Sequence, residues 1–213
     1  MSGIIISIDG PAGSGKQRIA KYIASKYKFF HLDSGVLYRR LTLMIINKNI
    51  NIDNSVNIKK FVNSLDTLSS RNHSNLRKEE ISKASAKIAK IAAVRNFINN
   101  QQKIIVKNML KLFEGCVIDG RDIGSKVFTE AQIKLFIDVK VQIRAKRRHK
   151  QLIEIGEKSI HAQILKEIQL RDKIDKNRKH SPLIKSRGSI TIDNSEDFKT
   201  TIMAVNTALK KIK

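Results

Sequence analysis

The chain has 213 residues, with 42 lysines and arginines against 19 aspartates and glutamates, and a formal net charge of +23 at pH 7. Its 41% hydrophobic content suffices for the core of one domain. A single cysteine, Cys116, excludes disulfide scaffolds and zinc sites made of several cysteines. No apolar run approaches the roughly 18 residues of a membrane span. We therefore expect a cytoplasmic protein that does not use a membrane, and we expect a monomer.

The charge excess has two interpretations. A basic surface attracts phosphate groups, either on nucleic acids or on small nucleotides. Alternatively the excess is compositional, since the chain is rich in isoleucine, lysine and asparagine, and most lysines then only cover the solvated surface. The positions of the arginines therefore carry more information than the number of lysines.

The chain begins with the pattern of a strand, a loop and a helix. Ile4–Ile8 is an apolar run, a glycine-rich turn follows, and apolar residues recur at helical spacing from Ile19 to Tyr27. Phe29–Leu32 predicts a second, short strand, and Val36–Ile46 predicts a second helix. These elements alternate as βαβ units do.

The middle of the chain differs from its two ends. Residues 47–77 are dominated by Asn, Ser and Lys and indicate an inserted or lid-like region, whereas helical periodicity returns from Glu79 to Phe113. A C-terminal helix is predicted from near Ser195 through Leu209. Buried strands are predicted at Val117–Ile118, Ile133–Ile137 and Ser189–Ile192. Strands that alternate with long helices predict an α/β fold with a parallel sheet.

The glycine-rich turn after the first strand fits the phosphate-loop pattern G-x-x-x-x-G-K. Glycines allow the backbone to curl so that successive N–H groups point at phosphate oxygens, an approach that side chains would block. The lysine reaches the phosphates, and the positive end of the next helix adds to the attraction. We expect these residues to bind the phosphates of a nucleotide: Gly10, Pro11, Ala12, Gly13, Ser14, Gly15, Lys16, Gln17 and Arg18.

Three further clusters mix arginine with aspartate: Leu32–Arg39, Ile118–Gly124 and Arg171–Arg178. Each cluster alone is compatible with a salt-bridged surface. Together with the phosphate loop they resemble the cytidylate kinase family, the bacterial CMP/dCMP kinases, over nearly the whole chain. The most specific parts are D-G-R-D-I-G and R-D-x-x-D-x-N-R. The resemblance implies a P-loop NTPase-like parallel sheet with flanking helices, a nucleoside monophosphate (NMP)-binding subdomain and a lid.

The resemblance also implies the reaction, which is in-line transfer of a phosphoryl group from ATP to CMP or dCMP, with ATP and Mg²⁺ as the cofactors. An acceptor phosphate has a second pKa of about 6, so it is already largely an anion at neutral pH and needs no general base. The difficulty is to bring several negative charges together. We expect one domain over residues 1–213. Its parts are a core of residues 1–46, 114–142 and 185–213, an NMP-binding subdomain at 47–113, and a lid at 143–184.

Four cations match the phosphate-contacting positions of the family and are expected to be catalytic: Lys16, Arg39, Arg121 and Arg178. Arginine suits phosphate binding because its planar guanidinium group can donate hydrogen bonds to two phosphate oxygens at once. A second basic cluster lies where a mobile helix could close over the transferring group: Arg144, Lys146, Arg147 and Arg148. A solvated helix face or a nucleic-acid patch is the alternative interpretation of this second cluster.

By resemblance, Asp122 and Arg95 select the base. Cytosine offers an N4 donor and an unprotonated N3, so a carboxylate that accepts and a guanidinium that donates distinguish it from uracil. The family also uses a serine against the base, and this chain has Ala86 there, with Ser82 and Ser85 nearby. Strict preference for CMP is therefore open at this stage.

The remaining substrate contacts implied by the resemblance concern the sugar and the acceptor phosphate. Arg171 and Asp175 match the pair that recognises the sugar. Ser34 matches the acceptor-site serine, and its alternative role is that of a helix N-cap. Arg39, Arg121 and Arg178 contact the acceptor as well as the transferring group.

The phosphate loop departs from the family after Lys16. Gln17 and Arg18 stand where a Ser or Thr hydroxyl helps to hold Mg²⁺ in related kinases. The metal ligands stay open between water, Gln17, and ATP oxygens with Asp33 or Asp119 behind them. The same departure suggests, as one alternative, a nucleotide-binding protein with impaired catalysis.

Two other functions compete with a CMP/dCMP kinase. Another nucleoside monophosphate kinase is the nearest, and the D-G-R-D turn argues against it. A nucleic-acid-binding protein is the second. The absence of tryptophan, the 5% aromatic content and the aspartate-containing clusters argue against that function. We therefore expect small nucleotides as partners and no specific nucleic acid.

Overall fold

The computed structural model describes residues 3–69, 76, 78–154 and 156–210. Five strands form one parallel sheet in the order β2-β3-β1-β4-β5. The strands are β1 (Ile4–Asp9), β2 (Phe30–Asp33), β3 (Gly115–Gly120), β4 (Ile133–Asp138) and β5 (Ile190–Asp193). The predicted α/β fold with a parallel sheet is confirmed. β3 is buried along its whole length, as expected for a strand covered on both faces.

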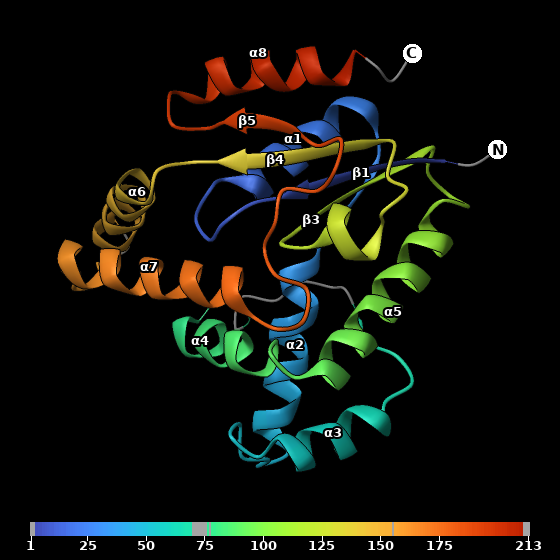
Figure 1. Cartoon of the computed structure of the whole chain (residues 1–213), viewed down its shortest axis with the longest axis vertical. Coiled ribbons are helices and arrows are strands. Elements are labelled where there is room, and N and C mark those ends of the chain that lie inside the picture. Colours follow the sequence, from blue (N-terminus) through green and yellow to red (C-terminus); the bar gives the residue numbers. More distant parts are fainter. Residues whose placement is uncertain (1–2, 70–75, 77, 155, 211–213) are drawn as a thin grey trace.

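Helices cover both faces of the sheet (Figure 1). α1 (Lys16–Tyr27) and α8 (Phe198–Leu209) pack with β1, β4 and β5 around one core, which contains the fully buried Ile8 and Ile23. α2 (Ser34–Asn47) and α5 (Ala92–Met109) pack with β2 and β3 around a second core. The sheet is thus the middle of three layers.

The second core extends below the sheet into a helical layer (Figure 1). There α3 (Ser55–Asn63) and α4 (Glu79–Ile88) join α2 and α5. The region at 47–77 therefore contains a packed helix that sequence analysis did not predict, since Ile58 and Val62 of α3 belong to the second core. Residues 70–75 and 77 of that region lie outside the described residues.

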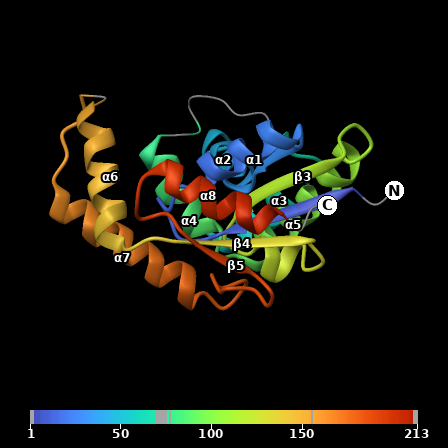
Figure 2. The same ribbon diagram turned by 90° about the horizontal axis from the view of Figure 1, so that it is seen from above.

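α6 (Val141–Glu154) and α7 (His161–Asn177) form an arm beside the sheet (Figures 1 and 2). The arm has a small core of its own, made of Ala145, Leu152 and Ile164. Its separate packing shows that α6 and α7 share few apolar contacts with the two main cores.

Two predicted helix boundaries differ from the structure. α2 begins at Ser34, and Asp33 occupies the N-cap position, so the alternative role of Ser34 as an N-cap is wrong. α8 begins three residues later than predicted, because the N–H of Ser195 donates to the Asp193 carboxylate at 2.8 Å in a turn. The N-cap of α8 is Asp197, whose carboxylate accepts from the Thr200 N–H at 2.9 Å.

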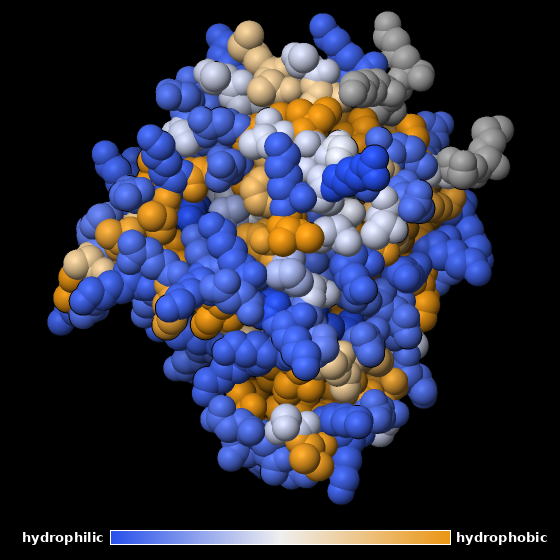
Figure 3. Space-filling model, viewed as in Figure 1, coloured by the Kyte–Doolittle hydropathy of each residue, from blue (hydrophilic) through white to orange (hydrophobic). Residues whose placement is uncertain are grey.

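Hydrophilic side chains cover most of the face that Figure 3 shows, in keeping with the high lysine content. In the described ranges, no helix combines the length and the apolar character that a membrane crossing requires.

Candidate active site

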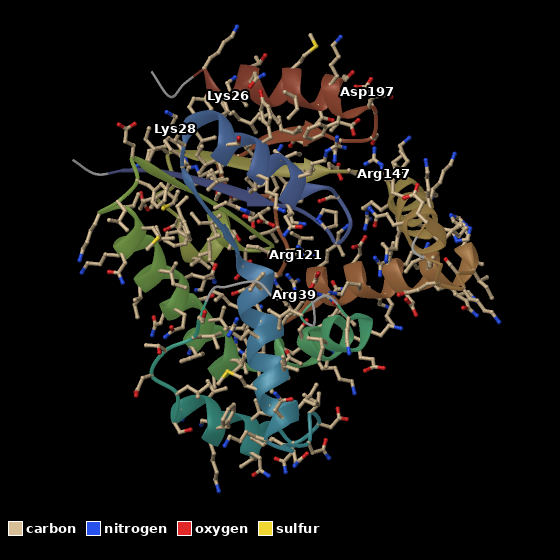
Figure 4. The ribbon with its side chains drawn as sticks, turned by 180° about the vertical axis from the view of Figure 1, so that it is seen from behind. Lys26, Lys28, Arg39, Arg121, Arg147 and Asp197 are labelled. Carbon is tan, nitrogen blue, oxygen red and sulfur yellow. The ribbon has the colours of Figure 1, made fainter. Side chains whose placement is uncertain are left out.

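The carboxyl ends of three neighbouring strands bring the sequence motifs to one edge of the sheet. Asp33 at the end of β2 lies in register with Asp119 of β3, and Asp9 of β1 lies in register with Gly120. Ligands of open α/β sheets bind at this edge. Arg39 and Arg121 lie close to each other where α2 meets the sheet (Figure 4).

The phosphate loop connects β1 to α1 and depends on glycine at defined positions. Gly13 and Gly15 have φ angles of 72° and 84°, in the left-handed region that favours glycine. A Cβ on Gly15 would collide with the side-chain amide of Asn194. The loop therefore has the curled backbone that its sequence predicts.

Lys16 is the first residue of α1 and is almost fully buried, with 5% of its surface exposed. Its Nζ donates to the Pro11 carbonyl oxygen at 2.8 Å and lies 3.4 Å from the Ser14 hydroxyl. Burial and the neighbouring Arg121 lower the pKa of Lys16 well below its ordinary value. An anionic phosphate oxygen bound beside Nζ would raise the pKa of Lys16 again, because an opposite charge favours the protonated lysine.

Asp9 ties the phosphate loop to the D-G-R-D-I-G turn. Its two carboxylate oxygens accept from the backbone N–H groups of Ile123 and Gly124, both at 2.8 Å. Burial raises the pKa of Asp9 from 3.8 to about 6, although the two hydrogen bonds act in the opposite direction. Asp9 was not among the residues predicted from the sequence; a carboxylate at the end of a buried strand, directly before Gly10, was the available signal.

Asp175 binds three of the predicted arginines. Its carboxylate lies 3.1 Å from Arg121 Nε, 3.2 Å from Arg178 Nη1 and 3.4 Å from Arg171 Nε. Burial acts to raise the pKa of Asp175, but the three cations outweigh it and hold the pKa below its ordinary value. One buried anion thus keeps three guanidinium groups together next to Lys16, with which it also interacts electrostatically.

Asp122 and Arg95 form a buried ion pair between the D-G-R-D turn and α5, with Arg95 Nη2 and Asp122 Oδ2 2.5 Å apart. Arg178 Nη2 lies 3.8 Å from the other Asp122 oxygen. The Arg95 guanidinium also lies 5.6 Å from the centre of the Tyr38 ring. The two residues predicted to select the base are therefore in direct contact.

The third predicted acceptor arginine, Arg39 of α2, has a separate partner. Its Nη2 donates to Asp33 Oδ2 at 3.0 Å, and the same oxygen accepts from Gln17 Nε2 at 2.8 Å. Asp33 thereby links α2 to the start of α1. The other unusual residue of the loop, Arg18, lies over the Phe198 ring at 3.6 Å from its centre.

Several polar atoms of this site are buried and make no hydrogen bond among the described residues. They are Tyr38 Oη, Arg39 Nε, Arg95 Nε and Arg178 Nη2. Buried polar atoms are otherwise nearly always paired. Their gathering around the aspartates indicates a site that binds a polar, anionic ligand.

Arg144 and Arg147 of the second basic cluster make hydrogen bonds within the protein. Arg144 is buried and donates to the Val139 and Ala12 carbonyl oxygens, both at 3.0 Å, and to Asp172. Arg147 donates to the backbone carbonyls of residues 194–196. Lys146 is exposed. The expected closure of this cluster over a transferring group stays a prediction.

The serines near the base and the acceptor are placed as follows. Ser34 is buried against Gly120, whose added Cβ would contact the Ser34 hydroxyl. The Ser85 hydroxyl donates to the Ser82 carbonyl oxygen, which also accepts from Arg171 at 3.4 Å. Near Ala86, the Ser85 hydroxyl therefore already has a partner within the protein, and the Ser82 carbonyl oxygen has two.

The structure adds one further pair that sequence analysis did not single out. His31 Nε2 lies 2.7 Å from Asp119 Oδ1, on neighbouring strands. A short β2 that ends in His-Leu-Asp gave no signal of this pairing, because the partner lies 88 residues away.

The side chains at the strand ends fit Mg²⁺ in donor chemistry. Asp33, Asp119 and the amide oxygen of Gln17 are hard oxygen donors at one edge of the sheet, which is the type of ligand that Mg²⁺ prefers. Among the described residues there is no group of three or more His, Cys, Asp or Glu side chains that could hold a metal ion.

Comparison with known proteins decides the family. A family model described as cytidylate kinase matches residues 6–213. The chain belongs to the cytidylate kinase family. It is a nucleoside monophosphate kinase, and membership of the family supports the phosphorylation of CMP. The resemblance given by the phosphate loop and the arginine–aspartate clusters is thereby confirmed.

Individual cytidylate kinases match over most of their length. The chain is 35% identical to a cytidylate kinase of Fusobacterium nucleatum over 223 residues, covering 100% of both chains. It is 39% identical to one of Rickettsia felis over 194 residues, covering 90% of this chain and 84% of the relative.

Solved structures support the fold alone. A gluconokinase from Sinorhizobium meliloti matches with a TM-score of 0.52 at 12% identity, covering 99% of this chain and 93% of that chain. A shikimate kinase from Bacteroides thetaiotaomicron matches with a TM-score of 0.52 at 12% identity, covering 99% of each. Both are kinases, which agrees with the predicted P-loop NTPase-like sheet.

Proposed function

We propose that this chain transfers the terminal phosphoryl group of ATP to CMP and dCMP by in-line displacement, giving ADP with CDP or dCDP. The observation that carries the proposal is the cluster of Arg121, Arg171 and Arg178 on the buried Asp175 carboxylate, next to Lys16 of the phosphate loop. Such a cluster suits two anionic nucleotides held end to end.

Electrostatic stabilisation is the main task in this reaction, since the acceptor phosphate needs no general base. Lys16 and the N–H groups of the phosphate loop bind the donor phosphates. Arg39, Arg121 and Arg178 bind the acceptor phosphate and the transferring group. Their aspartate partners keep the guanidinium groups oriented before substrate arrives, so little reorganisation is needed during transfer.

Asp122 and Arg95 select the base in this proposal. The Asp122 carboxylate accepts from N4 of cytosine, and Arg95 donates to N3 or O2. Arg95 Nε and Tyr38 Oη make no hydrogen bond among the described residues, which supports a polar base as the ligand beside them. Uracil presents an oxygen where cytosine presents N4, which opposes the carboxylate, so CMP is preferred over UMP.

The sugar and the acceptor phosphate have separate contacts. Arg171 and Asp175 bind the ribose or deoxyribose, and Ser34 binds the acceptor phosphate beside Gly120. Because Asp175 also orients three arginines, sugar binding and phosphate binding share one carboxylate. Both CMP and dCMP are expected to be substrates.

Mg²⁺ would be held on the donor side by Asp33, Asp119 and Gln17, largely through water. When bound, the ion neutralises part of the phosphate charge. Gln17 lacks the hydroxyl of related kinases, but its side chain already contacts Asp33. In the proposed enzyme, residues 143–184 form the lid, residues 47–113 form the NMP-binding subdomain, and the rest of the chain forms the core.

The test is an assay of purified protein with ATP, Mg²⁺ and, separately, CMP, dCMP, UMP, AMP and GMP. CDP and dCDP should form fastest. Faster conversion of UMP or AMP than of CMP would overturn the base assignment. ATP binding with no CDP formed at any Mg²⁺ or Mn²⁺ concentration would instead favour a nucleotide-binding protein with impaired catalysis, which the Gln17-Arg18 pair suggests.

A further inference from the structure

The phosphate loop is held from outside by the side chain of Asn194, which follows β5. Asn194 is buried, and its Nδ2 donates to the Ser14 carbonyl oxygen at 2.7 Å. Its Oδ1 accepts from the Thr201 hydroxyl at 2.8 Å. A carbonyl oxygen only accepts hydrogen bonds, so the Ser14 contact fixes which end of the amide faces the loop.

This contact determines the direction of a backbone N–H group. The described part of the chain has no cis peptide bond, and in a trans peptide the C=O and the N–H point in opposite directions. Holding the Ser14 carbonyl toward Asn194 therefore turns the Gly15 N–H away from Asn194. That N–H donates no hydrogen bond to any group in the described ranges, which leaves it available to a ligand.

A second peptide of the loop is held in the same way. Arg144 Nη1 donates to the Ala12 carbonyl oxygen at 3.0 Å, so the Gly13 N–H points in the opposite direction. The Gly13 N–H likewise donates no hydrogen bond among the described residues. Two alternate peptides of the loop thus have their carbonyls bound from outside.

Asn194 itself is firmly placed. Its backbone N–H donates to the Asp138 carbonyl oxygen at 3.1 Å, which ties it to the end of β4. Its own carbonyl accepts from Arg147 Nη1 at 2.6 Å, which ties it to α6. The absence of a side chain at Gly15 lets the amide approach closely. The amide is therefore a rigid support rather than a mobile contact.

We propose that Asn194 is a positioning residue for phosphate binding: its amide holds the Ser14 carbonyl outward and so presents the Gly15 N–H to the donor phosphates. The proposal rests on the proposed function, because it assigns the phosphate loop to the donor nucleotide. It assigns no contact between Asn194 and the nucleotide.

The experiment compares Asn194→Ala with Asn206→Ala. Asn206 is a matched control because its amide oxygen also joins α8 to α1, through Tyr22 Oη at 3.0 Å and Lys26 Nζ at 2.8 Å, away from the loop. Calorimetric binding of inorganic tripolyphosphate reports on the phosphate loop without a base or sugar. Asn194→Ala should weaken this binding about tenfold, the loss expected for one oriented hydrogen bond, whereas Asn206→Ala should leave it unchanged.

Steady-state kinetics separate positioning from mere loss of structure. Asn194→Ala should raise the KM for ATP about tenfold, with a smaller change in kcat and an unchanged KM for CMP. A destabilised protein would instead lose kcat in proportion to the folded fraction, with both KM values unchanged. Thr201→Val removes the hydroxyl that donates to Asn194 Oδ1 but keeps the shape of the side chain. It should also raise the KM for ATP, by a smaller factor, and leave the KM for CMP unchanged.

Equal tripolyphosphate affinity and equal KM for ATP in wild type, Asn194→Ala and Asn206→Ala would overturn the proposal. If Asn194→Ala does not fold, unchanged values in Thr201→Val decide against it. A wild type that fails to phosphorylate CMP would contradict the proposed function instead, and tripolyphosphate binding would still test the role of Asn194.

Discussion

Buried and half-buried carboxylates organise the arginines of the active site at the level of single residues. Asp175, Asp122 and Asp33 each bind at least one arginine that sequence analysis assigned to phosphate, base or sugar. A buried carboxylate without its partner would be costly, as would a buried guanidinium. The charges therefore depend on one another, and removing one member should disturb the others.

Lys16→Ala should reduce the rate of CDP formation by at least about 10²-fold, because one preorganised cation that stabilises the transferring group is lost. The free energy of unfolding should not fall, since burial and Arg121 already disfavour the charged lysine. Lys21→Ala, an exposed lysine on the same helix, is the control and should retain full activity. Retention of activity in Lys16→Ala would contradict the assignment of the phosphate loop.

Asp122→Asn should narrow the preference for CMP over UMP. The amide keeps the shape of the side chain but can donate to the uracil oxygen, and it loses the charge that accepts from N4 of cytosine. The ratio of kcat/KM for CMP to that for UMP should fall by roughly 10-fold to 100-fold, in line with about 1–3 kcal/mol per unpaired contact. The measurement is the ratio itself, because it is insensitive to the fraction of folded enzyme. An unchanged ratio would remove Asp122 from base selection.

The residue types of this site could be predicted from the sequence, but their pairing could not. The motifs predicted Arg95 and Asp122 for the base and Arg171 with Asp175 for the sugar. Which aspartate binds Arg121 depends on the approach of α7 to the D-G-R-D turn, across 54 residues of chain. Contacts of this range follow from tertiary packing, which local patterns do not contain.

At the level of elements, the strands and the first two helices could be predicted because continuous apolar runs and helical periodicity are strong signals. α3 was missed because Ile58 and Val62 are the two buried residues among many Asn, Ser and Lys. The π-helical turn at Ile123–Val127 has no sequence pattern of its own. It follows from Asp9, whose carboxylate binds the first two N–H groups of that turn.

The burial of Asp9 at the end of β1 should make stability depend on pH. The pKa of Asp9 is about 6 in the folded protein against 3.8 as the ordinary value. Between these values the folded state holds a proton that the unfolded state releases, so this contribution to stability is present at low pH and is lost as pH rises through about 6. The contribution at about pH 5 should exceed that at about pH 7.5 by roughly 1 kcal/mol.

Denaturant unfolding of wild type and Asp9→Asn at both pH values measures this contribution. The asparagine cannot titrate, so the difference in unfolding free energy between the two proteins isolates Asp9 from the other carboxylates. The free energy of unfolding of wild type should increase relative to that of Asp9→Asn as the pH is lowered. A difference that stays constant, or that changes in favour of the variant, would show that Asp9 is not the titrating group.

For the whole molecule, the net charge of +23 opposes folding through self-repulsion, and the active site concentrates part of that charge. A dianionic ligand at the site should therefore stabilise the fold by binding, whereas simple salt acts only by screening. The two effects differ in concentration dependence and in specificity. This difference distinguishes specific ligand binding from the non-specific attraction of anions by a strongly basic protein.

Thermal unfolding in the presence of CMP tests that distinction. At about 100 times its dissociation constant, CMP should add about 2.7 kcal/mol to the free energy of unfolding. For a chain of this size the midpoint temperature should then rise by about 5–10 °C. NaCl at matched ionic strength should raise the midpoint temperature less, and the rise with UMP should lie between those with NaCl and with CMP.

The control is Asp122→Asn. In this variant the temperature shifts with CMP and UMP should converge while the shift with NaCl stays the same, since the variant changes one buried charge among many. An equal shift with CMP and with NaCl in wild type would mean that the arginine cluster attracts anions without forming an acceptor site.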